Sequence, residues 1–529
     1  MYEFCYHDLL RRNLGVRDTA IALVTGTDQL TYGELGQRVE ALAAWLHGKG
    51  IRRGDRVVVN LFKSIEEVVA IFAVSRIGAV FVDIHYQWTM PQLAYVLADC
   101  GAKAAIVDER RAKEMASAGM LPAGLEIVLG RGKAPGDARF HSWDDVPSRG
   151  APPAFRGLDV DLAAILYTSG STGKPKGVML SHLNLLQGAR SVAEYVGNTS
   201  ADRVLSVLPF SFDYGLNQLN TMFLVGGTLV LQPVVMPAEI VRAIQRHDVT
   251  GMAAVPPLWN QLVRHLLAAP AAVPTLRYVT NSGGKIPQEI LRAMPRVFPG
   301  TRIFLMYGLT EAFRSTYLAP ELFATKMGAI GKAIPGAEVY LIHERGICGP
   351  GEQGELVHRG SLISMGYWGN PDATAAKIRP CPQLRHLIGD EKVVYSGDLV
   401  RMDEDGVLWF VNRMDTMIKC SGFRISPTEV EDVLHGSGRV ASAVAFGVAD
   451  DMMGQVVEVA VSWVGDGAGD IDGLLAHCRK EMPQYMVPRR IHVWTGNMPR
   501  TGSGKIDVPA VVKACIEGLL PMDRGTGHK

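Results

Sequence analysis

Short apolar runs rich in β-branched residues alternate along most of the chain with segments whose apolar residues recur at helical spacing. The run DRVVVNLF at residues 55–62 predicts a strand. The segment SIEEVVAIFAVSRIG that follows predicts a helix with Ser64 as its N-cap and Gly78 as its stop. The same rhythm returns at Ala79 and in RVLSVLPF, GTLVLQP, GMAAVPP and LRYVTNSGG. Alternating strands and helices predict α/β layers with substantial parallel sheet.

The pattern changes after about Val411. A hairpin-like turn and a polar crossover lead into a helix that starts near Ser426, and the short strands VASAVAFGV and VVEVAVSWV follow with helices between them. This composition predicts a compact α+β unit of ordinary domain size. We therefore expect a large N-terminal domain of layered α/β sheets at 1–411 and a small α+β C-terminal domain at 412–529.

Composition narrows the class of protein. The 529 residues are too many for one ordinary core, which agrees with two domains. Lys and Arg number 54 against 53 Asp and Glu, so a net charge of +1 gives no electrostatic reason to expect nucleic acid or an anionic membrane as a partner. No apolar run is long enough to span a bilayer, and the N-terminus does not read as a signal peptide.

The seven cysteines are scattered and form no CxxC pair, which argues against a disulfide framework or a structural zinc site. A cytoplasmic protein is the expectation.

A segment rich in glycine, hydroxyl groups and lysine, YTSGSTGKPKGVMLSH, follows the apolar run AAIL. Glycines let the backbone approach an anion, and successive N–H groups can surround phosphate oxygens. The segment is no Walker A loop, because Pro175 follows Lys174. By itself it is compatible with a phosphate-binding loop or with a surface loop that happens to be rich in Gly and Ser.

This segment resembles the phosphate-loop signature of the adenylate-forming superfamily, which contains acyl-CoA synthetases, adenylation domains of nonribosomal peptide synthetases and luciferases. Further motifs resemble that superfamily in its order along nearly the whole chain: LTYGELGQRVEALAAWL, MYGLTEA, GELVHRGSLISMGYWGNPDAT, YSGDLVRMDEDGVLWFVNRMD, IKCSGFRISPTEVE and MPRTGSGKID. Chance agreement of all of them in order is remote, so the surface-loop interpretation is dropped.

The resemblance implies a two-step reaction. A carboxylate attacks the α-phosphate of ATP in the presence of Mg²⁺, which gives an acyl-adenylate and pyrophosphate, and a thiol then takes the acyl group as AMP leaves. Two anions must meet, so positive charge and N–H donors have to offset their repulsion. The implied small molecules are ATP, Mg²⁺, a small carboxylic or amino acid, and either CoA or the phosphopantetheine of a separate carrier protein.

The resemblance also implies roles for individual residues. Lys505, Thr310 and Glu311 are the implied catalytic residues, with Glu311 as the magnesium ligand. The implied nucleotide contacts are Thr168, Ser169, Gly170, Ser171, Thr172, Gly173, Lys174, Lys176, Gly283, Gly284, Tyr307, Gly308, Asp398 and Arg413. Without its motif, Glu311 would be interpreted as a solvated loop residue. Tyr307 is compatible with a core tyrosine as well, and a plain turn explains the Gly pair equally well. Asn412 stands where the family more often has Gly, and Asn tolerates left-handed backbone.

The C-terminal domain is mobile in the family that the motifs resemble. Asp415 falls at the implied hinge, and Gly422 at the implied channel for the pantetheine thiol. One rotation of this domain would remove Lys505, which serves adenylation, from the site and bring in the crossover motif, which serves the thiol step. Cys420 is not expected to be a nucleophile, because no His partner is indicated. His182 is interpreted as a residue that starts a helix.

The segment LPFSFDYGLNQL departs most from acyl-CoA synthetases, which often have a His after an aromatic residue here. Phe212-Asp213 resembles the pair in amino-acid-activating domains, where the Asp binds the substrate ammonium, and a buried Asp among aromatic residues needs a cation. The alternative is that Asp213 caps the following helix and that the acid is fatty or aromatic. Arg314 aligns with pocket-lining positions and could bind a second carboxylate, although Arg is more often a surface residue. The implied substrate contacts are Asp213, Tyr214, Asn217, Asn281, Met306 and Arg314.

Two classes of function remain open. The first is an AMP-forming acid–thiol ligase, and the second is a non-catalytic relative that serves as a binding module. The presence of Lys505 and Glu311 in their motifs argues against the second. No carrier domain follows Lys505, so the acceptor thiol is expected to act in trans.

Overall fold

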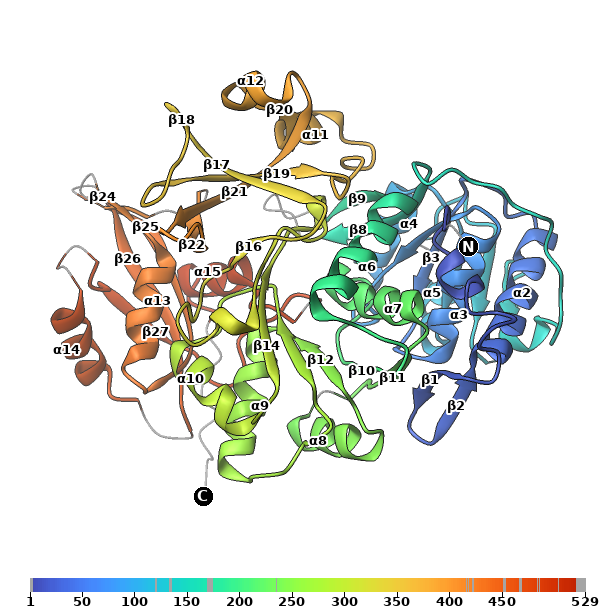
Figure 1. Ribbon diagram of the computed structural model, residues 1–529, viewed down its shortest axis with the longest axis horizontal. Helices are drawn as coiled ribbons and strands as arrows, with labels where there is room; N and C mark the ends of the chain where they lie inside the picture. Colours follow the sequence, from blue (N-terminus) through green and yellow to red (C-terminus); the bar gives the residue numbers. More distant parts are fainter. Residues whose placement is uncertain are drawn as a thin grey trace.

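The computed structural model describes residues 3–118, 121–132, 136–168, 175–234, 236–414, 416, 418–420, 423–450, 453–465, 469–482, 484, 486–502 and 504–519. Two sheets with their helices lie next to each other in the first part of the chain, an antiparallel sheet lies beside their junction, and the C-terminal sheet lies at the far end of the molecule from the first (Figure 1). This is the predicted arrangement of a large α/β domain followed by a smaller α+β domain.

The first sheet has the strand order β7-β6-β5-β3-β4-β8-β9 and is parallel except for the antiparallel pair β8-β9. Its strands are β3 (Arg56–Asn60), β4 (Val80–Asp83), β5 (Ala102–Val107), β6 (Ile127–Gly130), β7 (Phe140–Ser142), β8 (Leu162–Thr168) and β9 (Lys176–Ser181). Parallel neighbours need crossover connections, and α3 (Ile65–Arg76), α4 (Met90–Asp99) and α5 (Glu109–Ala118) supply them.

The second sheet has the order β16-β15-β14-β13-β12-β10-β11-β1-β2, and β11 to β14 together with β10 run parallel. Its strands are β1 (Ile21–Thr25), β2 (Asp28–Thr31), β10 (Arg203–Ser206), β11 (Thr228–Leu231), β12 (Gly251–Ala254), β13 (Tyr278–Asn281), β14 (Arg302–Tyr307), β15 (Thr316–Leu318) and β16 (Lys332–Ala333). The helices associated with this sheet are α6 (His182–Val196), α7 (Asp213–Val225), α8 (Pro237–Arg246), α9 (Pro256–Ala268) and α10 (Gln288–Val297). Helix α1 (Asp8–Arg11) precedes β1, and helix α2 (Tyr32–Gly48) follows β2.

The third sheet is antiparallel, with the order β18-β17-β19-β21-β20 and β22 paired with β21. Its strands are β17 (Ala337–His343), β18 (Gly346–Ile347), β19 (Gln353–Gly360), β20 (Ile378–Pro380), β21 (Lys392–Met402) and β22 (Leu408–Arg413). The helices α11 (Pro371–Lys377) and α12 (Arg385–Ile388) belong to this part, and short 3₁₀ helices lie at η1 (Trp143–Asp145), η2 (Thr310–Ala312), η3 (Pro320–Leu322) and η4 (Pro382–Leu384).

The C-terminal sheet has the order β24-β23-β26-β25 with β27 paired with β26. Its strands are β23 (Ile418–Cys420), β24 (Phe423–Ile425), β25 (Val440–Asp450), β26 (Gly454–Trp463) and β27 (Arg490–Val493), and its helices are α13 (Pro427–Gly436), α14 (Ile471–Glu481) and α15 (Val508–Ile516). The chain leaves the third sheet at Arg413 and enters this one at Ile418. The division at 411/412 stays a prediction.

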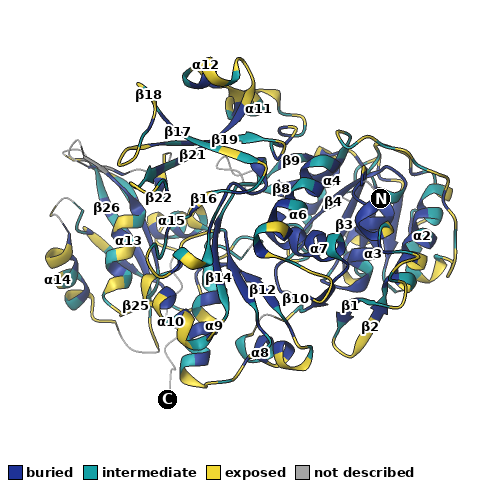
Figure 2. Ribbon diagram, viewed as in Figure 1, coloured by how far each residue is buried: buried dark blue, intermediate teal, exposed yellow. Residues whose placement is uncertain are grey.

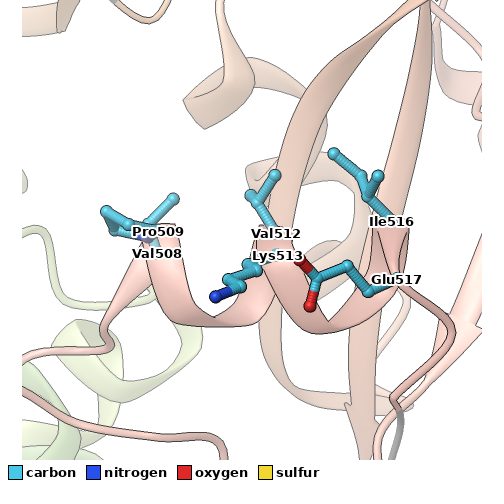
Figure 3. Close-up of a pocket in the computed structure, with 6 residues that line it drawn as sticks. All are labelled: Val508, Pro509, Val512, Lys513, Ile516 and Glu517. Carbon is cyan, nitrogen blue, oxygen red and sulfur yellow. The ribbon is translucent and has the colours of Figure 1, made fainter. Parts of the chain in front are cut away.

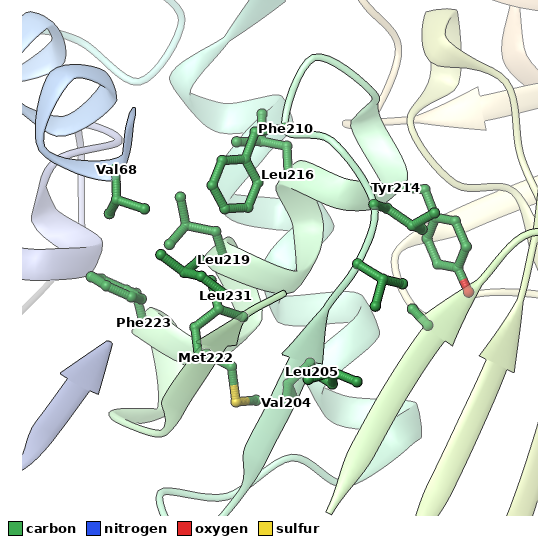
Figure 4. Packing of buried hydrophobic residues seen from close by; sticks show 14 of the residues in the cluster. Val68, Val204, Leu205, Phe210, Tyr214, Leu216, Leu219, Met222, Phe223 and Leu231 are labelled. Atoms are coloured by element: carbon green, nitrogen blue, oxygen red, sulfur yellow. The ribbon is translucent and has the colours of Figure 1, made fainter. Parts of the chain in front are cut away.

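One large apolar core joins the first two sheets. Helix α7 lies at its centre: Leu219 and Phe223 point toward Val68 of α3, whereas Tyr214 points to the other side, toward the strands of the second sheet (Figure 4). Buried residues fill the inner strands and the exposed ones lie mainly on the outer helix faces and loops (Figure 2). The start of α7 is thus held by the core on one side and contacts β13 on the other, where the Tyr214 hydroxyl bonds Thr280.

The start and the end of α3 agree with the prediction from the sequence. The Ser64 hydroxyl accepts a hydrogen bond from the N–H of Glu67 at the start of α3, and Gly78 has the positive φ of 74° expected of a residue that ends a helix. The seven cysteines, all within the described residues, are buried and free of disulfides. Among the described residues, no helix is both long enough and apolar enough to cross a membrane.

Gly215 sets how closely α7 approaches the chain before it. A Cβ on Gly215 would lie 2.0 Å from the carbonyl oxygen of Pro209, a distance that requires the backbone to move. We expect Gly215→Ala to lower the free energy of unfolding by about 1–3 kcal/mol, as overpacking does. The helical control is Gly48→Ala, where a Cβ meets nothing within 4 Å, and where Ala stabilises a helix by up to about 1 kcal/mol. Urea unfolding measures both, and equal stabilities of the two variants would contradict this account of the packing.

Candidate active site

Lys505 enters a site on the large domain from the C-terminal domain. A Cβ on Gly283 would lie 2.8 Å from Lys505 Cε, and Lys505 Nζ lies 5.4 Å from the centre of the Phe212 ring. Burial lowers the pKa of Lys505, and the negative charge of Asp213 acts in the opposite direction. The structure therefore brings together three features predicted from separate motifs: Lys505, the Gly pair after β13 and the start of α7.

A tight turn presents Lys505. The N–H of Thr501 donates to the carbonyl of Lys505 at 2.8 Å, and the N–H of Gly504 donates to the carbonyl of Thr501 at 2.9 Å. This turn rests on the segment after β4, because a Cβ on Gly502 would lie 3.1 Å from Trp88 Nε1 and 3.3 Å from His85 Cβ. His85 and Trp88 were missed in the sequence, where nothing connects them to a loop over 400 positions away.

Asp398 lies opposite Arg413 where β21 pairs with β22. The Tyr307 hydroxyl donates to Asp398 Oδ2 at 2.5 Å, and Arg413 Nε lies 3.2 Å from Asp398 Oδ1. Burial and the nearby Asp398 raise the pKa of Tyr307 well above its usual value. Asn412 lies within β22 and does not have a positive φ, so tolerance of left-handed backbone is not what this position requires.

Glu311 lies in η2, directly after the end of β14. Its Oε1 accepts a hydrogen bond from the Tyr367 hydroxyl, and Lys176 Nζ lies 5.7 Å from the centre of the Tyr367 ring. Thr168 and Lys176 are paired across β8 and β9, so the two ends of the glycine-rich segment are held side by side. Tyr367 was not singled out in the sequence, although it lies inside one of the motifs.

Some predicted residues lie outside the part of the chain that the structure describes. They are Ser169, Gly170, Ser171, Thr172, Gly173, Lys174, Asp415 and Gly422.

Asp213 is the first residue of α7 and is buried. The N-cap of α7 is Phe212, which makes no side-chain cap bond. Burial is the largest influence on Asp213 and raises its pKa, whereas the charges of Arg314 and Lys505 and the N–H of Tyr214 lower it. Asp213 thus lies one position inside the expected cap, and both interpretations, a partner for a cation and a residue that stabilises the start of the helix, stay open.

Arg314 is buried rather than exposed, with 1% of its surface accessible. Its Nη1 donates to Ser282 Oγ at 2.8 Å, and its guanidinium lies 4.8 Å from the centre of the Tyr214 ring. The Tyr214 hydroxyl in turn shares a hydrogen bond of 2.6 Å with Thr280 Oγ1 at the end of β13. Arg314 therefore lies among residues of α7 and the end of β13, as its alignment with pocket-lining positions suggested, and not at the surface, which was the alternative.

Asn281, Met306 and Gly308 lie at the ends of β13 and β14. Asn281 donates to the carbonyl of Gly284 at 3.1 Å, Met306 Sδ accepts a hydrogen bond from the Tyr195 hydroxyl at 2.6 Å, and a Cβ on Gly308 would lie 3.0 Å from Arg314 Cα. Asn217 lies one turn after Asp213 on α7. Ligands of open α/β sheets bind at the carboxyl ends of parallel strands, where these residues lie.

Two features lie apart from these residues. His182 starts α6, as predicted; its Nδ1 accepts the N–H of Tyr6 at 2.9 Å, and burial lowers its pKa to about 4. A surface pocket of about 460 Å³ lies along α15 and contains none of the site residues (Figure 3). Its lining residues are Val508, Pro509, Val512, Lys513, Ile516 and Glu517.

Comparison with known proteins gives two matches to family models: "AMP-binding enzyme" over residues 10–368 and "AMP-binding enzyme C-terminal domain" over residues 429–505. The chain is 33% identical to a feruloyl-CoA synthase of an Amycolatopsis species over 92% of this chain and 94% of that one. It is 30% identical to Surfactin synthase subunit 2 of Bacillus subtilis over 93% of this chain and 13% of that much longer one. The structure of the anthranilate CoA ligase AuaEII in complex with anthranoyl-AMP has the same fold, with a TM-score of 0.87, 24% identity and coverage of 98% and 99%.

His358 of β19 lies fully buried beside Ser315 and gives a testable pH dependence. Its Nδ1 lies 3.1 Å from Ser315 Oγ, and burial lowers its pKa to about 4. The unfolded state, with a His pKa near 6.5, therefore takes up the proton first as the pH falls. We expect the free energy of unfolding to fall by about 2 kcal/mol from pH 7 to pH 5 through this one residue.

Urea unfolding at several pH values measures this effect. His358→Gln should flatten the dependence between pH 6.5 and pH 4, whereas the same change at the exposed His386 should leave it unaltered. An unchanged pH dependence in His358→Gln would contradict the assignment of a neutral buried imidazole.

Proposed function

We propose, from the premise that the chain belongs to the family of AMP-binding enzymes, that it uses ATP to activate a carboxylic acid as an acyl-adenylate and then passes the acyl group to a pantetheine thiol. Family membership makes it an AMP-forming acid–thiol ligase. The observation that carries the proposal is the position of Lys505, which reaches Gly283 and Phe212 from the other domain. A non-catalytic role would not require a partly desolvated lysine there.

The proposed reaction has two steps. A carboxylate oxygen of the acid attacks the α-phosphorus of ATP and pyrophosphate leaves; the thiol, having lost its proton, then attacks the acyl carbon and AMP leaves. Lys505 and Thr310 would offset the charge of the carboxylate and the α-phosphate, because donors fixed before the reaction need no reorganisation during it. Asp398 would accept the ribose hydroxyls in place of the Tyr307 hydroxyl, and Arg413 would support it.

The phosphates would lie at the end of β8. Thr168, Lys176 and the glycine-rich segment between them would hold the outer phosphates. Glu311 fits a magnesium ligand, because Mg²⁺ is commonly bound through one carboxylate together with phosphate oxygens and water. When bound, Mg²⁺ would neutralise charge on the phosphates.

We further propose that the acid is an amino acid whose ammonium group binds Asp213. Burial raises the pKa of Asp213, so a cation beside it would restore the charged form. The competing proposal is a fatty or aromatic acid, and the name of the Amycolatopsis relative favours an aromatic one. The acceptor is free CoA, as in that relative's name, or a separate carrier protein, and we propose a cytoplasmic location because the seven cysteines are unpaired.

Pyrophosphate release, screened over amino acids, fatty acids and aromatic acids with ATP and Mg²⁺, tests the proposed function. Activated acids are then offered CoA and a phosphopantetheinylated carrier protein, and the thioester is identified by mass. Failure of every acid to release pyrophosphate would contradict the proposal.

Lys505→Ala should abolish adenylate formation while leaving ATP binding in place. Loss of one preorganised donor typically costs about 10²–10³ in kcat, and an interaction made only in the transition state lowers kcat rather than affinity. Lys513→Ala, on the outward side of α15, is the matched control and should keep wild-type rates. Pyrophosphate release and nucleotide calorimetry are the measurements, and normal turnover of Lys505→Ala would refute the role assigned to this lysine.

Asp213→Asn separates the two proposals for the acid. Asn stabilises a helix start about as well as Asp. If Asp213 binds an ammonium group, loss of its charge leaves that group buried without a partner, at a cost of about 3–5 kcal/mol, and amino-acid activation should collapse with ATP binding intact.

Asp470→Asn is the control, because Asp470 is the N-cap of α14 in the other domain and its carboxylate accepts the N–H of Gly473. Pyrophosphate release with the preferred acid distinguishes the two proposals. Full activity of Asp213→Asn, with only fatty or aryl acids accepted, would favour the competing proposal.

A further inference from the structure

We propose that Arg314 binds a second anionic group on the acid substrate, so that the enzyme activates a small dicarboxylic acid or an acidic amino acid. This inference rests on the proposed function and specifies the acid that the same site takes.

The guanidinium of Arg314 is buried with donors to spare. Of its three nitrogens, Nη1 donates to Ser282 Oγ, whereas Nε and Nη2 find no hydrogen-bond partner in the part of the chain that the structure describes. Only 1% of the residue is accessible, so water from the surface does not hydrate these two groups. Nε and Nη2 form one edge of the planar guanidinium, the edge that binds a carboxylate through two parallel hydrogen bonds.

The surroundings of Arg314 offset its charge only in part. The Tyr214 ring face lies 4.8 Å away, and Asp213 is close enough for its pKa to be lowered by Arg314. Neither contact uses the Nε–Nη2 edge. A buried cation with an unpaired edge costs free energy on folding, so a partner from outside the described residues, such as water, an ion or a ligand group, is needed to complete it.

The backbone before Arg314 is strained in a way that turns the side chain inward. Phe313 has φ 56° and ψ −58°, and the N–H of Arg314 donates to the carbonyl of Ala312 at 2.6 Å, which closes a three-residue turn. A positive φ in a bulky residue persists only where the surroundings enforce it. The Phe313 ring does so by packing on Gly188, where a Cβ would lie 2.3 Å from the ring. The turn begins at the last residue of η2, so it fixes Arg314 relative to Thr310 and Glu311.

Unpaired acceptor groups lie on residues next to those that Arg314 contacts or influences. Asn281 Oδ1, next to Ser282, and Asn217 Oδ1, one turn after Asp213, are buried and find no partner among the described residues. Together with Asp213 they provide acceptors, whereas Arg314 provides donors. A site with both suits a short acid with polar ends, because a long alkyl chain would leave all of these groups unpaired.

The unpaired edge of Arg314 therefore favours an acid that has a second carboxylate. Lys505 is assigned to the carboxylate that reacts, so the Arg314 edge is left for a carboxylate at the other end of a short chain. If Asp213 also binds an ammonium group, the substrate is an acidic amino acid; if it does not, the substrate is a simple dicarboxylic acid.

The test uses stable mimics of the acyl-adenylate, the 5′-O-(N-acylsulfamoyl)adenosines, whose affinities are measured by calorimetry. Matched pairs carry butanoyl against 3-carboxypropanoyl groups, with five- and six-carbon pairs made in the same way. We expect the wild-type protein to bind the carboxylated member of at least one pair about 100-fold more tightly, since a site built for a polar group rejects an analogue that lacks it. Arg314→Met should reduce this preference to less than about 3-fold, and Arg314→Lys should keep an intermediate preference because it retains the charge but not the fork.

The control is Arg302→Met, the same change at the opposite end of β14, where Arg302 donates to the carbonyl of Val196. It should keep the wild-type preference. A second set carries 2-aminobutanoyl and aspartyl groups, which add an ammonium group to the butanoyl and 3-carboxypropanoyl mimics. The change in affinity on adding the ammonium group reports separately on Asp213.

Equal wild-type affinity for both members of every pair would overturn the inference, and so would an Arg314→Met variant that weakens both members equally, because Arg314 would then bind the nucleotide or the reacting carboxylate. Failure of the wild type to bind any mimic would instead contradict the proposed function, and with it this inference.

Discussion

The insertion of one cation from the C-terminal domain into a partly desolvated site of the large domain is the interaction on which the rest of the structure depends. Lys505 reaches the residues after β13 from a turn that packs against the segment containing His85 and Trp88. Burial lowers the pKa of Lys505 while Asp213 favours its charged form, so the large domain both penalises and attracts the incoming charge.

The site concentrates groups that the free protein satisfies incompletely or satisfies with its own side chains. Tyr307 donates to Asp398 and Tyr367 donates to Glu311, so two carboxylates assigned to ligands have internal partners. Arg314 and Asn281 have polar atoms without such partners among the described residues. A ligand that binds Asp398 or Glu311 exchanges one hydrogen bond for another. A ligand that binds Arg314 or Asn281 adds hydrogen bonds that the free protein lacks among its described residues, so these two residues discriminate more strongly between substrates.

Much of the fold and part of the site could be predicted from the sequence. The strand predicted at residues 55–62, the helix that begins after Ser64 and the helix at Ser426 follow from caps, turns and periodicity, which are local properties. Lys505, Asp398 and Glu311 could be named because each lies in a motif. His85 and Trp88 could not, because their role comes from a contact between domains. Arg314 could be named as a pocket-lining residue, but its complete burial could not be predicted, because Arg is usually found at the surface.

The sequence by itself determined the order of strands and helices, the two regimes on either side of residue 411 and the identity of the motifs, because apolar periodicity and turn residues act over short distances along the chain. Only the tertiary structure decided which of these motifs meet. The pairing of β21 with β22 puts Arg413 opposite Asp398, and the strained turn at Phe313 aims Arg314 between α7 and β13. Both depend on packing between segments remote in sequence, and whether a buried charge has a partner is a property of that packing and of no residue taken alone.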